Sequence, residues 1–351
     1  MSAANLNVSP ELESLIARLP KVELHLHIEG TLEPELAFAL AKRNDIALPF
    51  ANVEALRAAY NFKDLQSFLD LYYATAAVLR TRKDFYALAM SYFTRAFADG
   101  VVHAELFFDP QTHTVRGVNL GDVFGGLRDA MTDAHNRYGI TSELILCFLR
   151  HLSEQEALET LQQALPYRKE FVGVGLDSGE RGNPPSKFVN VFAKARELGL
   201  RVVAHAGEEG PAGYIYEALD LLKVDRIDHG VRCDEDPELV ARLARERIPL
   251  TVCPLSNLKL CVVKDLRNHN FAKLLRAGVA VTINSDDPAY FGGYIADNYR
   301  ATAAALGLSA AEIVAVTENA VRGSYLAATE KTALLGRIRA AAARPIQLTV
   351  R

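Results

Sequence analysis

Short apolar runs alternate with longer amphipathic segments along most of the chain. The segments between these runs have apolar residues at helical spacing. They are 83–99, 119–138, 153–169, 186–198, 214–222, 236–247 and 271–277. A short apolar run bounded by polar turns is typical of a buried strand, and a 3.6-residue period is typical of a helix that covers it. The strands are therefore expected within 21–30 and at 101–108, 140–149, 171–176, 201–205, 226–229, 248–253 and 279–284.

Eight strands that alternate with helices predict a parallel sheet, and eight such units are the number that closes a (β/α)8 TIM barrel. The segments 34–43 and 52–79 read as additional helix, so we expect a helical insertion after strand 1. An open, doubly wound sheet is the alternative fold. The phosphate-binding glycine motif often found in such sheets is absent, because Gly173-x-Gly175 lacks the third glycine. No linker or repeat interrupts the pattern, and residues 1–351 are expected to form a single domain.

The inserted segment carries aromatic residues at intervals, and two interpretations of them stay open. These residues are Tyr60, Phe62, Phe68, Tyr72 and Tyr73. A stripe of this kind usually packs into the core, and a long insertion can also cover a substrate site as a lid.

Composition and charge narrow the classes of function. The chain of 351 residues is 50% hydrophobic and 23% charged, which suffices for a large core. Its net charge of −4, with no run of Lys or Arg, argues against nucleic acid as a partner and favours a small-molecule substrate. The four cysteines form no C-x-x-C pair and are expected to be reduced thiols.

The N-terminal residues show no secretory pattern, and no apolar run approaches the roughly 18 residues that span a bilayer. We therefore expect a cytoplasmic protein with no membrane partner. The sequence gives no indication of its oligomeric state.

Two histidines mark the first strand. Because side chains alternate across a strand, His25 and His27 are expected on one face, with Leu24, Leu26 and Ile28 on the other. Two neighbouring imidazoles with an apolar backing form half of a metal site, whereas two ordinary hydrogen-bonded polar residues are the alternative.

Polar residues at the predicted ends of the other strands favour the metal site. In a (β/α)8 barrel these ends converge on one face, where catalytic residues gather. Three histidines and a carboxylate can complete a tetrahedral zinc shell and leave other acids free for catalysis. The residues at these ends are His25, His27, Gly179, Glu180, His205, Glu208, His229, Ser256, Asn257, Asp286 and Asp287.

A zinc site of this composition favours hydrolysis, because zinc lowers the pKa of bound water and needs no redox partner. Glu208 lies three residues beyond His205, and Gly207 between them permits a tight turn, so Glu208 can act as a proton donor to the substrate. Asp286 and Asp287 are expected to divide between metal and substrate. Each of these residues also has a structural alternative. Glu208 would then cap a helix, Asp286 and Asp287 would form a solvated acidic turn, and His229 would be a hydrogen-bonded core histidine.

Several ordered motifs resemble the adenosine/adenine deaminase family of the amidohydrolase superfamily. They are Pro20–Leu32, which contains His-Leu-His-Ile-Glu-Gly, together with His205–Glu208, Ile227–Gly230, Cys253–Asn257 and Ser285–Pro288. The resemblance covers nearly the whole chain. It implies a (β/α)8 barrel that acts as a metal-dependent hydrolase.

The resemblance also implies a role for each site residue. One zinc ion per chain would be held by His25, His27, His205 and Asp286. Glu208 would protonate the purine ring nitrogen N1, His229 would orient and deprotonate the attacking water, Asp287 would hydrogen-bond N7, and the backbone of Gly179 would meet N3. Binuclear members of the superfamily usually carry a modified lysine at the end of strand four, and the segment 176–180 contains no lysine.

Glu29 favours adenine as the substrate. Nucleoside deaminases of this family typically carry aspartate there, whereas adenine deaminases typically carry glutamate. We interpret the longer side chain as occupying the space that ribose would need and leaving an unpaired polar group against it. Such a mismatch can reject the nucleoside strongly. The expected reaction is the hydrolytic deamination of adenine to hypoxanthine and ammonia. Adenosine or deoxyadenosine, another ring or ester, and a catalytically silent zinc-binding interaction protein remain alternatives.

Overall fold

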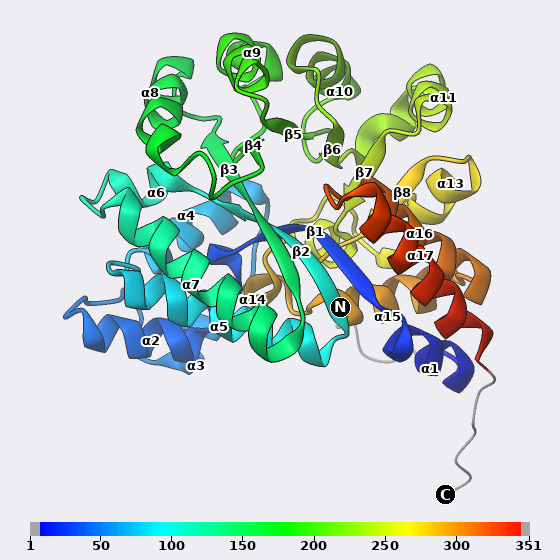
Figure 1. Ribbon diagram of the computed structural model, residues 1–351, viewed down its shortest axis with the longest axis horizontal. Helices are drawn as coiled ribbons and strands as arrows, with labels where there is room; N and C mark the ends of the chain where they lie inside the picture. The colour runs from blue at the N-terminus through cyan, green and yellow to red at the C-terminus, as the bar shows by residue number, and fades with distance from the viewer. Residues whose placement is uncertain (1–7, 345–351) are drawn as a thin grey trace, which may run out of the picture.

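The computed structural model describes residues 8–344 as a barrel of eight parallel strands (Figure 1), so the two ends of the expected domain, 1–7 and 345–351, lie outside the described residues. Neighbouring strands pair in chain order, and a parallel bridge between Leu26 and Asp286 joins the last strand to the first. This order confirms the predicted TIM barrel. The strands are β1 (Lys21–His27), β2 (Val101–Phe108), β3 (Thr141–Leu149), β4 (Gly173–Asp177), β5 (Arg201–Ala206), β6 (Arg226–His229), β7 (Pro249–Val252) and β8 (Ala280–Ile283).

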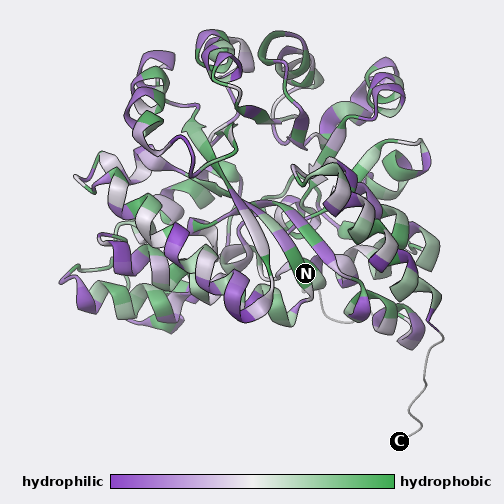
Figure 2. Cartoon of the chain, viewed as in Figure 1, coloured by the Kyte–Doolittle hydropathy of each residue, from purple (hydrophilic) through white to green (hydrophobic). Residues whose placement is uncertain are grey.

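Amphipathic helices surround the barrel, and most of them mix hydrophilic and hydrophobic residues (Figure 2). Their bounds match the sequence pattern to within a few residues, because one face of each must be apolar to cover the strands. Among residues 8–344, none of the helices has both the length and the apolar character needed to cross a bilayer. These helices are α7 (Leu120–Tyr138), α8 (Glu154–Ala164), α9 (Val189–Glu197), α10 (Ala212–Glu217), α11 (Pro237–Glu246), α13 (Phe271–Arg276) and α16 (Ala310–Gly323).

The insertion after β1 consists of α2 (Pro34–Arg43), α3 (Val53–Ala58) and α4 (Leu65–Ala76), and α5 (Arg82–Ala98) is the helix that leads into β2. The stretch 52–79, expected to be helical throughout, is interrupted before α4. Asp64 begins α4 with a capping box, in which its side chain accepts from the Ser67 backbone N–H and the Ser67 side chain bonds the Asp64 backbone. Because an N-cap residue is non-helical, this box starts a new helix instead of continuing the previous one.

Further short elements fall in loops that the pattern did not predict as helical. α6 (Pro110–Thr114), α12 (Pro254–Lys259) and α14 (Pro288–Phe291) each begin with a proline shortly after a strand, where proline suits the first turn of a helix. Each is too short to show a helical period. The longer α1 (Pro10–Arg18), α15 (Ile295–Leu306) and α17 (Ala328–Ala343) complete the α-helices of the described residues. Single 3₁₀ turns lie at Glu29–Thr31, Leu165–Tyr167, Pro185–Phe188, Val231–Glu235 and Leu266–Asn268, and a π-helical turn at Ala218–Leu222.

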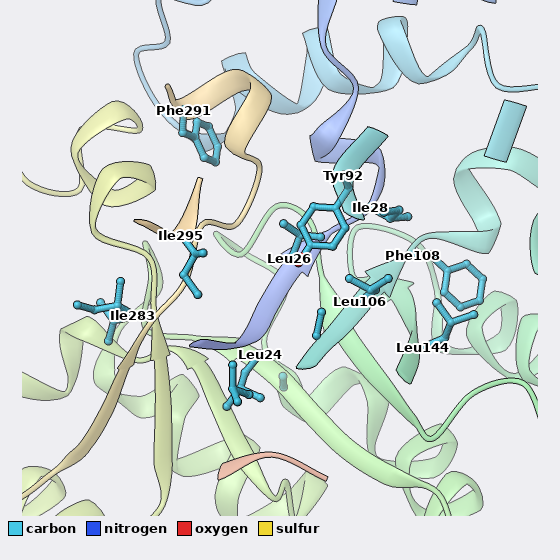
Figure 3. Close-up of a cluster of buried hydrophobic side chains, with 14 of the residues drawn as sticks. Leu24, Leu26, Ile28, Tyr92, Leu106, Phe108, Leu144, Ile283, Phe291 and Ile295 are labelled. Atoms are coloured by element: carbon cyan, nitrogen blue, oxygen red, sulfur yellow. The ribbon is translucent and has the colours of Figure 1, made fainter. Parts of the chain in front are cut away.

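The core has an outer and an inner layer. Leu24 and Leu26 of β1, with Ile28 directly after the strand, belong to the large cluster between the strands and the surrounding helices (Figure 3). The alternate residues of the same strand, His25 and His27, point into the barrel, where their rings lie 5.0 and 5.1 Å from that of Phe107. The alternation predicted for β1 is therefore confirmed, and it brings both histidines to the centre of the barrel.

Candidate active site

A cavity at the carboxyl ends of the strands combines charged residues with an aromatic cover. Its polar lining comes from the ends of six strands, and its apolar lining comes largely from α4 and from Leu260 and Phe291. The α4 residues are Leu65, Phe68, Leu69, Tyr72 and Tyr73, so the aromatic stripe is packed and also covers the cavity. The polar residues are His27, Asp109, Asp177, Ser178, His205, Glu208, His229, Asp286 and Asp287.

Four residues expected to bind a metal converge on one point. Asp286 Oδ1 lies 3.1 Å from His25 Nε2 and 3.5 Å from His27 Nε2. The Nε2 atoms of His27 and His205 are 3.2 Å apart. His229 joins this group, with its Nε2 3.7 Å from Asp286 Oδ2. The set whose ligand atoms all lie within 4.8 Å of one another is His25, His205, His229 and Asp286, which has the composition to hold a metal ion; it contains His229 in place of the expected His27, which groups with Asp286 and Asp287.

The other ring nitrogens of these histidines face oxygen atoms. Thr251 Oγ1 lies 2.9 Å from His25 Nδ1 and donates to Asp228, while Asp228 Oδ2 lies 3.6 Å from His205 Nδ1. Asp177 Oδ2 lies 3.5 Å from His27 Nδ1. Partners on Nδ1 orient an imidazole and leave Nε2 for a metal. Apart from the Asp286 carboxylate, buried His25 Nε2 has no hydrogen-bond partner among residues 8–344, so the donor set fits a metal ion.

Unusual backbone conformations orient two of the residues in this cluster. His229 and Asp286 both adopt left-handed conformations, with φ of 60° and 64°. Such conformations are costly for residues other than glycine and gather at functional sites. Asp286 is also fixed by its backbone, because its N–H donates to the His25 carbonyl at 3.1 Å and its carbonyl accepts from His27 N–H at 3.0 Å. The same bonds that join β8 to β1 therefore place the Asp286 carboxylate beside the histidines.

Glu208 lies in the loop after β5, where Gly207 takes a φ of 72° that a side chain would strain. The Glu208 carboxyl group is buried, and its Oε1 lies 3.6 Å from His229 Nε2. Burial, with Asp286 and Glu180 nearby, raises the pKa of Glu208 well above its usual value. This shift favours the protonated carboxyl group, from which Glu208 can donate a proton to a ligand.

Glu180 holds the Glu208 loop in place, a role that its position at the strand end did not reveal. Its buried carboxylate accepts four backbone N–H bonds, from Gly207 at 2.6 Å, Glu208 at 3.0 Å, Glu209 at 2.8 Å and Gly210 at 2.7 Å. Four donors on one carboxylate form an anion nest that fixes the loop.

We expect Glu180→Gln to lower kcat by about 10- to 100-fold, since its amide offers N–H groups where the loop needs an acceptor and a small displacement of Glu208 is costly. The measurement is steady-state kinetics, with metal content determined on the same samples. Glu159→Gln, on the exposed face of α8, is the matched control. An unchanged kcat with a lowered melting temperature would limit Glu180 to a structural role.

Asp287 occupies the cavity wall beside β1. A side chain at Gly30 would overlap the Asp287 carboxyl, so the glycine after Glu29 makes room for it. Burial, with Asp286 and Glu208 nearby, raises the pKa of Asp287 well above its usual value. The pKa of Asp286 moves the other way: burial opposes ionisation, but His25, His229 and His27 outweigh it and hold the pKa well below its usual value. The two adjacent acids therefore differ in protonation.

His229 is suited to accept a proton. Burial, reinforced by the charges of His25 and His27, lowers the pKa of His229 to about 3. Its Nδ1 lies 3.4 Å from Asn257 Nδ2, and Asn257 Oδ1 lies 3.0 Å from His269 Nε2. Asn257 therefore lies between the two imidazoles and suits a structural role. His229 is neutral near neutrality, with Nε2 facing Glu208 and Asp286.

Glu29 is buried behind the cavity wall. Its Oε1 lies 2.7 Å from His113 Nε2 and accepts from the Asp109 backbone N–H at 3.2 Å. Arg116 bonds the other nitrogen of His113 at 3.0 Å. His113 thus contacts a candidate specificity residue, and its position shortly after β2 is the one sequence feature that points to this contact. Gly179 follows Ser178, which lines the cavity.

Comparison with known proteins identifies the family to which this chain is similar. The family model described as adenosine deaminase matches residues 20–341. A protein named adenine deaminase from Cupriavidus necator is 60% identical over 333 residues, which cover 95% of this chain and 95% of that protein. Another adenine deaminase, from Acinetobacter baylyi, is 60% identical over 90% of this chain and 96% of its own.

Solved structures agree with the fold. The crystal structure of adenine deaminase from Arthrobacter aurescens matches with a TM-score of 0.90 and 51% identity, covering 92% of this chain and 98% of that one. An amidohydrolase from Burkholderia ambifaria with bound Zn matches with a TM-score of 0.88 and 28% identity, covering 97% of this chain and 96% of that one.

Proposed function

Because the chain belongs to the adenosine deaminase family, as its motifs predicted, we propose that it is an adenine deaminase that converts adenine and water to hypoxanthine and ammonia. The family is metal-dependent, and the buried cluster of histidines with Asp286 is the observation that carries the assignment of hydrolytic chemistry. The relatives named adenine deaminase support the choice of substrate. The biological consequence is purine salvage or catabolism.

The metal is proposed to be one zinc ion, held by His25, His27, His205 and Asp286. The inward orientation of their Nε2 atoms and the Zn-bound structural neighbour support this choice. When bound, zinc supplies a water of lowered pKa as the nucleophile. The neighbouring His229 is neutral and can orient that water and accept its proton.

The remaining residues act on the purine. Protonated Glu208 donates to N1, so the ring can accept electron density as carbon 6 is attacked and ammonia departs. Protonated Asp287 donates to N7, and the Gly179 backbone meets N3. The aromatic cover from α4 suits a planar heterocycle and keeps bulk water from the reacting carbon.

Glu29 is proposed to discriminate against the nucleoside. Its carboxylate, held by His113 and the Asp109 backbone, occupies the space behind the cavity wall. We expect Glu29→Asp to lower the adenine-to-adenosine ratio of kcat/KM by about 10- to 100-fold, because the shorter side chain weakens its bonds to His113 and to the Asp109 backbone and lets the cavity wall yield to ribose. Parallel kinetics with both substrates measure the ratio. An unchanged ratio would rule out this steric account.

Product analysis tests the proposed reaction. Zinc-replete protein is incubated with adenine, and hypoxanthine is measured by chromatography and ammonia by an independent assay. Equal amounts of the two products are expected. A panel of cyclic amides and esters serves as the comparison, and turnover of one of these without turnover of adenine would replace the proposal with that of a different zinc hydrolase.

We also propose that residues 1–351 form a single domain and that the enzyme is cytoplasmic. The uninterrupted order from β1 to β8 supports the first proposal. The second is supported by four free cysteines, three of them buried, as expected in a reducing compartment.

A further inference from the structure

One buried carboxyl group of the cavity wall has no role in the proposed reaction. Asp109 follows β2, is 2% exposed and lines the cavity. Its Oδ2 accepts from the Tyr72 hydroxyl at 3.3 Å, while its Oδ1 has no hydrogen-bond partner among residues 8–344. The neighbouring Asp177 carboxyl group also has both oxygens unpartnered among these residues, and buried acceptors without donors are costly, so this pair of acids suits a ligand that supplies a donor.

Asp109 lies close to His27 and Asp177. The Nε2 atom of His27 faces Asp286 and His205, whereas its Nδ1 faces Asp177. Ligand atoms of His27, Asp177 and Asp109 lie within 4.8 Å of one another. Asp109 therefore lies beside the acid that faces His27 Nδ1 and is not part of the His25, His205, His229 and Asp286 cluster that carbon 6 would face.

The order of strands around the barrel gives an orientation for the purine. Glu208 follows β5, Gly179 follows β4, Asp109 follows β2 and Asp287 follows β8. Around a purine, N1, N3, N9 and N7 follow one another in this sequence. If N1 meets Glu208 and N7 meets Asp287, the arc from β4 back to β8 faces N3 and then N9. Asp109 lies within that arc.

We propose that Asp109 Oδ1 accepts a hydrogen bond from the N9–H of adenine and so determines the preference for a purine without a substituent at N9. The inference rests on the proposed function and deepens it. A carboxyl oxygen can accept this bond whether or not the group is ionised. A nucleoside has no hydrogen on N9 and leaves Asp109 unpaired, and a site built for a hydrogen bond rejects such a ligand strongly.

This assignment gives Glu29 an indirect part. Glu29 accepts from the Asp109 backbone N–H and is absent from the cavity lining, whereas Asp109 is part of it. Glu29 is therefore a positioning residue, and Asp109 is the residue that touches the substrate.

The test compares adenine with 9-methyladenine, which lacks the N9–H. The kcat/KM of adenine and the inhibition constant of 9-methyladenine are measured for wild type, Asp109→Ala and Asp109→Asn. In Asp109→Ala we expect kcat/KM for adenine to fall about 10- to 100-fold, since a lost hydrogen bond of this kind is worth about 1.5–3 kcal/mol, while 9-methyladenine binds equally well or better. Asp109→Asn keeps a carbonyl acceptor and is expected to retain most of the adenine activity.

Controls separate this role from others. Asp70→Ala, an exposed position on α4, should change neither quantity. Should Asp109→Ala fail to fold, Asp109→Leu gives the same comparison with the side-chain volume kept. Equal losses for both purines, or an unchanged adenine rate, would overturn the inference. Loss of a metal equivalent in Asp109→Asn would also overturn it, because Asp109, Asp177 and His27 would then form a second metal site.

The same experiment separates failure of the inference from failure of the proposed function. Wild-type protein that turns over adenine, with an unchanged preference in Asp109→Ala, contradicts the inference alone. Wild-type protein that does not turn over adenine contradicts the proposed function, and the proposed orientation of the purine falls with it.

Discussion

Glu208→Gln is expected to reduce kcat by about 10²- to 10⁴-fold while the protein keeps its metal. The glutamine amide has nearly the shape of the protonated carboxyl group, but it cannot transfer a proton to N1. Burial and the neighbouring acids raise the pKa of Glu208, which keeps the wild-type group protonated for this step. The measurement is single-turnover kinetics with adenine, together with metal analysis.

Glu209→Gln provides the matched control, because it makes the same change one residue further along the loop. Glu209 bonds Leu65 N–H at 3.3 Å and Arg181 at 3.4 Å, outside the cavity lining. Its activity should stay within a few-fold of wild type. Near-normal turnover by Glu208→Gln would remove Glu208 as the acid, whereas loss of metal from that variant would instead make it part of the metal site.

Removal of the metal is expected to abolish turnover and to lower the melting temperature. Buried imidazoles and the Asp286 carboxylate face one another at 3.1–3.7 Å, an arrangement that a bound cation would stabilise. Lewis-acid activation of water is worth several kcal/mol, which corresponds to at least about 10³-fold in rate. Chelation followed by dialysis, then stepwise addition of zinc, measures activity and stability together.

One equivalent of zinc should restore both properties. His25→Ala should lower the metal content itself, whereas His151→Ala, at an exposed position after β3, should leave it unchanged. Full activity in protein that contains no measurable metal would contradict the proposed mechanism. Restoration that requires two equivalents would contradict the single-metal site and favour a second ion near Asp109 and Asp177.

The barrel could be predicted because its two signals are local. Apolar runs and helical periods alternate in the sequence, and the strands pair in that same order. The interruption before α4 was missed, since it depends on the Asp64 capping box within an otherwise helical pattern. The short helices α6, α12 and α14 were missed because each begins with a proline shortly after a strand, so the segment reads as a loop.

The site residues could be listed because parallel strands end on one face, but their contacts could not. Glu180 was recognised at a strand end, yet its four bonds to the Glu208 loop depend on how two loops fold together. Asp109 and His113 carry no motif of their own, and their importance follows from their burial beside Glu29. Side-chain alternation assigns a face to a residue, and tertiary packing decides which residue that face meets.

The most direct test of the central claim is the ultraviolet absorbance change when purified, zinc-replete protein is mixed with adenine and, separately, with adenosine. The proposed function predicts rapid conversion of adenine and little or no conversion of adenosine. Conversion of adenosine alone would keep the zinc chemistry and overturn the assigned substrate. No change with either purine would contradict the claim that this cavity deaminates adenine.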